Sequence, residues 1–169
     1  MARTGRYNRF GVGLVSVALA ALGWLLIASP GSAAGPALTI DILSATPKTV
    51  TASPVTGEFL SVKPGLPPES TDRLATGPTP MIGTNTNCSV GRACWHPRTP
   101  PYPNQAFYGA PGAVTGPWSH RGDYESGDYT VRGCWTYQGN HTCASAPIGP
   151  HSYLSLGGAT VTGNSFRIY

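Results

Sequence analysis

Glycine and proline recur so often along this chain that long helices are excluded over most of its length. From Gly35 onward, the longest stretch free of both residues is Ala37–Thr46, only ten residues. Gly and Pro cost about 1 and 3 kcal/mol inside a helix, and isolated helices shorter than about 12–15 residues are marginal in water. Helical bundles and the larger α/β folds are therefore excluded, and short strands joined by turns are expected.

The first 34 residues have the layout of an export signal. Arg3, Arg6 and Arg9 precede an uncharged stretch, Phe10–Ala28, and Ser32-Ala33-Ala34 supplies small residues for cleavage. The uncharged stretch has 19 residues, which is also close to the length of a membrane span. An uncleaved anchor that leaves the rest of the chain outside the cell is therefore the alternative. We expect residues 1–34 to be a signal peptide and the remainder to be secreted.

The charge of the chain does not indicate a nucleic-acid partner. The formal net charge is +4, but three of the eleven basic residues lie in the signal segment. Without that segment, eight basic residues stand against seven acidic ones, for a net charge of +1. Nucleic-acid-binding domains are usually strongly basic. We therefore expect no nucleic-acid partner, and membrane contact only if the N-terminal segment stays uncleaved.

Aromatic residues divide the exported part of the chain into two zones. Between Gly35 and Thr84 only Phe59 is aromatic, whereas twelve aromatic residues follow from Asn85 onward. A segment that buries little apolar area cannot offset the entropy lost on ordering, so residues 35–84 are expected to be a Pro/Thr-rich linker or stalk. As an alternative, the alternating pattern of residues 38–42, and more weakly of residues 58–62, would add edge strands to a downstream sheet.

Residues 85–169 are expected to fold as a small all-β domain. Each strand candidate in this zone is bounded by Gly, Pro or Asn, the residues that punctuate β-sandwiches. The candidates are Arg92–His96, Tyr129–Tyr137, Ser152–Leu156, Ala159–Thr162 and Ser165–Tyr169. A domain of this size has a small core, and small secreted domains usually add covalent cross-links.

Four cysteines, all in the aromatic zone, provide such cross-links. They are Cys88, Cys94, Cys134 and Cys143. In an exported chain the default is two disulfides, of three possible pairings, and the spacing favours the two local pairs. If Gln138-Gly139 forms a two-residue hairpin loop, the last two cysteines lie opposite each other where antiparallel strands approach most closely. A zinc site is less favoured, because C-x2-C spacing does not occur.

One motif resembles a known family. Cys88-x-x-Gly91-x-x-Cys94 leads directly into Trp95, and the segment Tyr102–Gly109 has the spacing of a Greek-key signature, aromatic, four residues, aromatic, one residue, glycine. Together they resemble secreted actinobacterial peptidase inhibitors with a βγ-crystallin-like fold, over about residues 87–169. The resemblance implies a disulfide-stapled Greek-key sandwich that inhibits a secreted peptidase. It also implies a reactive peptide bond beside the second disulfide, at Cys134-Trp135.

Two groups of side chains are candidates for binding. Trp135 and Tyr137 fall on the same face of a predicted strand. Together with Trp95, they are expected either to pack in the core or to form an aromatic platform for the sugar rings of a cell-wall polysaccharide. The second group lies in the Pro-rich segment 96–104, where Arg98 and Tyr102 are expected to belong to a rigid binding edge.

Signatures of catalysis do not occur in the sequence. It has no G-x-S-x-G or H-E-x-x-H motif and no phosphate-binding glycine loop, and its four histidines are scattered. The densest carboxylate cluster, Asp123, Glu125 and Asp128, is expected to be a solvated loop rather than a calcium site. We expect no metal and no cofactor. The leading hypothesis is an exported, non-catalytic inhibitor of a secreted peptidase; the alternatives are a cell-wall or carbohydrate-binding surface module and a secreted antimicrobial protein.

Overall fold

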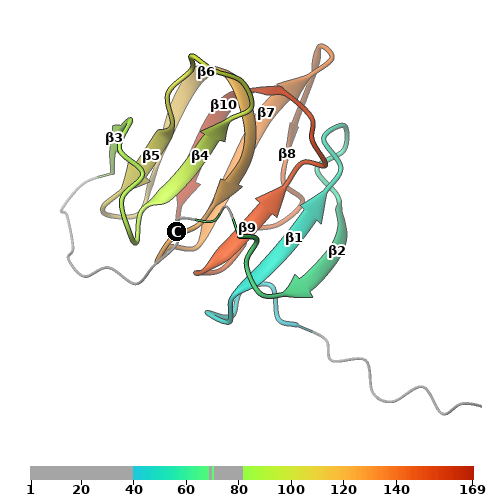
Figure 1. Ribbon diagram of the computed structural model, residues 1–169, viewed down its shortest axis with the longest axis vertical. Coiled ribbons are helices and arrows are strands. Elements are labelled where there is room, and N and C mark those ends of the chain that lie inside the picture. The colour runs from blue at the N-terminus through green and yellow to red at the C-terminus, as the bar shows by residue number, and fades with distance from the viewer. Residues whose placement is uncertain (1–39, 69, 71–81) are drawn as a thin grey trace, which may run out of the picture. The chain divides into compact units, whose positions relative to one another are not determined.

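A computed structural model describes residues 40–68, 70 and 82–169 of the chain. Within these residues the chain forms ten strands and no helix (Figure 1). The strands are β1 (Lys48–Ala52), β2 (Phe59–Pro64), β3 (Gly83–Asn85), β4 (Ala93–Pro97), β5 (Gln105–Tyr108), β6 (Gly112–Glu125), β7 (Val131–Tyr137), β8 (Asn140–Cys143), β9 (Ser152–Ser155) and β10 (Val161–Ile168). This confirms the all-β fold class predicted from the sequence. A helix suited to crossing a membrane does not occur among these residues. The predicted signal peptide, residues 1–34, lies outside them.

The strands pair into one curled sheet with the order β2-β1-β9-β6-β10-β7-β8. Strand β4 pairs with β6 and β5, and β5 also pairs with β3. All pairs are antiparallel except β1 with β9. The long strand β6 pairs with β10 along residues 112–121, and its last residues pair with β4 and β9, so it links these three strands.

An aromatic cluster fills the inside of the curl. The ring of Trp95 on β4 lies 5.4 Å from Tyr124 and 5.7 Å from Phe166, between ring centroids. Phe107 stacks on Phe166 at 4.0 Å. All four rings are fully buried. Their size favours a glycine on β10, because a Cβ on Gly163 would lie 3.0 Å from the Trp95 ring, a tight contact.

Part of the segment expected to be a linker belongs to the sheet. Strand β2 matches the weaker edge-strand candidate, and β1 pairs with both β2 and β9. The other strand candidate is wrong in its described part, residues 40–42: Asp41 instead accepts a hydrogen bond from the Leu43 N–H at 2.9 Å and starts a turn. Residues 35–39, 69 and 71–81 of the expected linker lie outside the described part of the chain.

Each strand candidate of the aromatic zone overlaps a strand, but the last two form one continuous strand, β10. Strands β5 and β6 had no candidate, and β8 was expected only as the partner in the Gln138-Gly139 hairpin. Strand β6 contains three glycines and a proline, which in a sequence resemble turn residues. The physical reason for two of these glycines is close packing: a Cβ on Gly116 would lie 2.5 Å from the Gly163 carbonyl, and one on Gly122 would lie 3.0 Å from the Arg98 guanidinium.

Both disulfides form as the spacing predicted. Cys134 pairs with Cys143 across the β7–β8 hairpin, and the register places Tyr137 opposite Asn140 around a Gln138-Gly139 loop. Both loop residues have positive φ, 49° and 83°, as a type I′ turn requires. The second disulfide, between the other two cysteines, closes a tight turn with a sequence separation of six residues. Two disulfides are typical of proteins in an oxidising, extracellular environment.

Candidate functional site

The Pro-rich segment between β4 and β5 is an exposed loop. Residues 99–103 are all exposed, while the residues on either side are partly buried. Three of the five are prolines, which fix the backbone φ angle and reduce the number of conformations open to the loop. We call Thr99–Pro103 the Pro-rich loop. It contains Tyr102, one of the predicted binding residues, and is directly preceded by another, Arg98.

A buried arginine anchors the base of the Pro-rich loop. Arg121 on β6 is only 4% exposed. Its Nη1 donates hydrogen bonds to the carbonyl oxygens of Pro103 at 2.7 Å and of Trp95 at 3.2 Å, and its Nε donates to Ser119 O at 3.0 Å. Burial lowers the pKa of Arg121. Within the described part of the chain no carboxylate pairs with this guanidinium, so backbone carbonyls stabilise its charge.

The middle of the loop rests on His120, also on β6. The Tyr102 and His120 rings are stacked, with centroids 4.0 Å apart and an interplanar angle of 13°. Thr99 Oγ1 lies 3.3 Å from His120 Nδ1, and the Arg98 N–H donates to His120 O at 2.8 Å. His120 adopts a positive φ of 57°, which marks a local irregularity of β6 at the point where the loop packs.

A polar pocket of about 360 Å³ lies beside the loop. It is lined by His96, Pro97, Arg98, Asn104, Asp123 and Tyr153. Asp123 organises this pocket, because its carboxylate accepts hydrogen bonds from Arg98 Nη2 at 3.0 Å, from Tyr153 Oη at 3.1 Å and from the Leu156 N–H at 2.7 Å. The carboxylate thus joins the start of the Pro-rich loop to β9.

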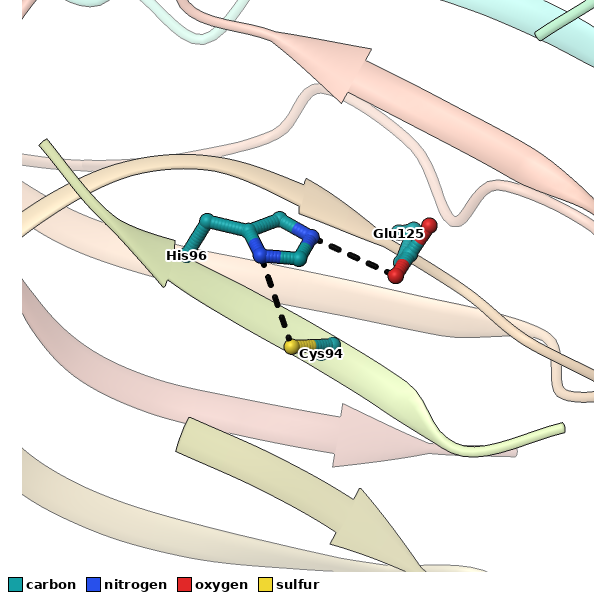
Figure 2. A group of neighbouring side chains, drawn as sticks. All are labelled: Cys94, His96 and Glu125. Carbon is teal, nitrogen blue, oxygen red and sulfur yellow. Dashed lines mark hydrogen bonds and ion pairs between the residues drawn. The ribbon is translucent and has the colours of Figure 1, made fainter. Parts of the chain in front are cut away.

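A His–Glu pair extends the polar contacts deeper into the fold. Figure 2 shows His96 between Cys94 and Glu125, with Nε2 3.3 Å from the Glu125 carboxylate and Nδ1 3.7 Å from the cysteine sulfur. These three residues lie close enough together to suggest a metal site. The sulfur of Cys94 is bonded to Cys88, however, so it provides no thiolate. His96 and Glu125 alone are two of the four ligands that zinc requires.

The predicted solvated carboxylate loop is wrong for two of its three members. Asp123 and Glu125 lie on β6 and are buried. Burial of a carboxylate is tolerated when hydrogen bonds or an opposite charge compensate it. Here Asp123 has the Arg98 guanidinium, and Glu125 has His96 and the Ser70 hydroxyl, which donates at 2.7 Å. Asp128 follows β6 and lies 3.9 Å from His151.

The structure separates the predicted binding residues into two groups. Tyr102 lies in the Pro-rich loop and Arg98 directly precedes it; the Tyr102 ring stacks on His120, and the Arg98 guanidinium contacts Asp123. Trp95 and Trp135 are fully buried, so the aromatic-platform interpretation is wrong for both; their Nε1 groups donate to Gly122 O at 2.9 Å and Pro54 O at 2.7 Å. Tyr137 is half-buried and packs against the core.

The peptide bond implied by the family resemblance is also part of the sheet. Cys134-Trp135 lies within β7, which pairs with β8 on one side and β10 on the other. A bond in a central strand cannot enter the active-site cleft of a peptidase, whereas a bond in an exposed loop can. The Pro-rich loop is therefore the better candidate for a contact with another protein. Its anchors, Arg121 and His120, were missed, and no local signal in the sequence pointed to them.

Comparisons with known proteins do not assign a family. A scan against protein-family models found no match. Searches of the curated proteins and of the solved structures found none either. The function is therefore argued from the Pro-rich loop and the pocket beside it.

Proposed function

We propose that this chain is an exported, non-catalytic binding protein whose contact edge is the Pro-rich loop. The observation that carries the proposal is an exposed loop with two fixed contacts: buried Arg121 donates a hydrogen bond to its Pro103 carbonyl, and its Tyr102 ring stacks on His120. A loop already fixed in its bound conformation loses little entropy on association, which favours tight binding. Export is supported by the signal-like N-terminal sequence and by the two disulfides.

A secreted peptidase is the proposed target. The resemblance to the βγ-crystallin-like peptidase inhibitors is supported by three features: a disulfide closes the C-x-x-G-x-x-C turn, Trp95 follows in a strand, and Gly109, at the end of the aromatic signature, has a φ of 101°. Inhibitors of this kind insert a preorganised loop into the enzyme's cleft. In this chain the inhibitory contact is assigned to the Pro-rich loop rather than to Cys134-Trp135.

Inhibition assays test this proposal. The purified chain is titrated against a thermolysin-like, a subtilisin-like and a papain-like peptidase. One class is expected to be inhibited, and Tyr102→Ala is expected to weaken the inhibition about tenfold or more, as truncation of an interface hot spot does. Leu60→Ala is the control, because Leu60 is a large apolar side chain that is more exposed than Tyr102, 64% against 38%, but lies on β2. Absence of inhibition of all three classes at micromolar protein would refute a peptidase target.

A cell-wall polysaccharide is the second candidate. It is favoured by the exposed Tyr102 ring, which lies near the pocket beside the Pro-rich loop. The lining of that pocket carries charged, amide and phenol groups. Flat aromatic rings and such polar groups are the usual components of sugar-binding sites. Pull-down on purified cell wall tests this: retention lost in Asn104→Ala and Tyr102→Ala, but kept in Leu60→Ala, would favour it over the peptidase.

A further inference from the structure

A second pocket, of about 360 Å³, lies on the outer face of the sheet where β6, β10 and β7 adjoin. It is lined by Ala113, Arg132, Cys134, Ser165, Arg167 and Tyr169. Along β7 and β10 these residues alternate with core residues such as Trp135 and Phe166, which places them on the face turned away from the core. This pocket shares no lining residue with the one beside the Pro-rich loop.

Strand register brings two arginines into one row of the sheet. Arg132 on β7 is the direct partner of Arg167 on β10, and Ala113 on β6 is the partner of Arg167 on its other side. Side chains directly opposite each other have Cβ atoms about 4.5–5.5 Å apart. Both arginine side chains line the pocket, together with the small side chain of Ala113. Ser165 adds a hydroxyl from the neighbouring row.

Arg132 and Arg167 have other partners than side-chain carboxylates within the described part of the chain. Arg132 Nε donates to the Ala144 carbonyl at 2.7 Å, which fixes the guanidinium and leaves its two Nη groups as further donors. The Arg167 guanidinium lies 5.7 Å over the Tyr169 ring. Among the residues that the structure describes, neither arginine forms an ion pair. Like charges directly opposite each other destabilise a sheet, and an anion bound between them would remove the repulsion.

We propose that this pocket binds the phosphate or sulfate group of a small molecule. Two guanidinium groups supply two positive charges and paired N–H donors, which match the oxygens of a tetrahedral oxyanion. The volume of the pocket falls in the range of small-molecule sites, about 300–1,000 Å³, and exceeds what a bare anion fills. The site is independent of the Pro-rich loop, so it goes beyond the proposed function.

Calorimetric titration of the full chain tests the proposal, with inorganic phosphate, sulfate and glycerol 3-phosphate as probes at constant ionic strength. Saturable binding is expected, and Arg132→Gln and Arg167→Gln are each expected to lower the affinity about tenfold or more. Lys63→Gln is the control, because it removes one exposed charge from β2. If glycerol 3-phosphate binds more tightly than phosphate, the ligand of the pocket is a phosphate group carried by a larger molecule. If the two bind equally, the ligand is the free anion. Both results support an oxyanion site.

A second measurement separates loss of binding from loss of folding. Arg167→Gln removes a repulsion, so its urea midpoint in chloride buffer is expected to equal or exceed that of the wild type. Arg132→Gln also loses the hydrogen bond to the Ala144 carbonyl, so its midpoint is expected to be lower, and its binding is compared only under conditions where the variant is folded. The amide and arginine Nε–H resonances of Arg132 and Arg167 are expected to shift on titration with phosphate. The proposal is overturned if the two Gln variants bind the probes as tightly as the wild type and Lys63→Gln do, or if the resonances that shift lie elsewhere on the chain.

Discussion

Replacing Arg121 with methionine removes the anchor of the Pro-rich loop while keeping most of the apolar volume of the side chain. Three hydrogen bonds from the guanidinium to backbone carbonyls are lost. A hydrogen bond to a charged group contributes about 1.5–3 kcal/mol. The three share one guanidinium, so their contributions are not additive, and burial of the charge itself opposes them. We expect Arg121→Met to lower the free energy of unfolding by about 3 kcal/mol.

Urea unfolding, followed by tryptophan fluorescence, measures this loss. The midpoint is expected to fall at an unchanged slope, because the variant still folds to the same surface area. Lys63→Met, which removes an exposed cation from β2, is expected to stay within about 0.5 kcal/mol of the wild type. Inhibition or cell-wall binding through the loop should also weaken in Arg121→Met. A loss below about 1 kcal/mol together with unaltered binding would refute the role of Arg121 as anchor.

Three further predictions concern the cross-link, the packing and the pH dependence of the fold. Replacing Cys134 and Cys143 together by serine should cost about 2–3 kcal/mol in urea unfolding, as expected for a loop with a sequence separation of nine. Gly163→Ala should lower the free energy of unfolding by about 1–3 kcal/mol, because its Cβ would meet the Trp95 and Trp118 rings. Burial raises the pKa of Tyr124, so the folded state holds this proton more tightly than the unfolded state does. Stability should therefore fall as the pH rises above about 10, and less steeply in Tyr124→Phe.

The features that the sequence predicted best are local ones. The two-residue loop Gln138-Gly139 determines the register of the β7–β8 hairpin, and the register in turn places Cys134 opposite Cys143. Short sequence separation also made the pairing of the other two cysteines predictable. In these cases the chemistry of a few neighbouring residues decides the structure.

Strand β6 shows why the rest of the fold was not predictable. Its glycines and proline resemble turn signals, yet two of the glycines lie against groups distant in the sequence: the Gly163 carbonyl on β10 beside Gly116, and the Arg98 guanidinium beside Gly122. One partner of β1 is more distant still, because the Nζ of the fully buried Lys48 donates to the Ser152 hydroxyl on β9, 104 residues away. The other acceptors of this ammonium group are nearby carbonyls. Such burial of a lysine has no local signature.

The candidate site shows the same difference between local features, which the sequence indicates, and contacts between distant residues, which it does not. The loop that contains Tyr102 and follows Arg98 could be expected from the sequence, because closely spaced prolines indicate a loop. Its supports could not, because the Arg121–Pro103 contact spans 18 residues and the Arg98–Asp123 contact 25. These contacts exist only once β4 and β6 have paired.

Backbone amide relaxation of the free protein, measured by NMR, tests most directly whether the Pro-rich loop is a preorganised binding edge. Thr99 and Tyr102 carry the amide groups within the loop, and Asn104 follows it. Order parameters of about 0.85, equal to those of the flanking strands, are predicted for all three. Values below about 0.6 at Thr99 and Tyr102 would contradict a preorganised loop, because the loop would then lose its conformational freedom only on binding.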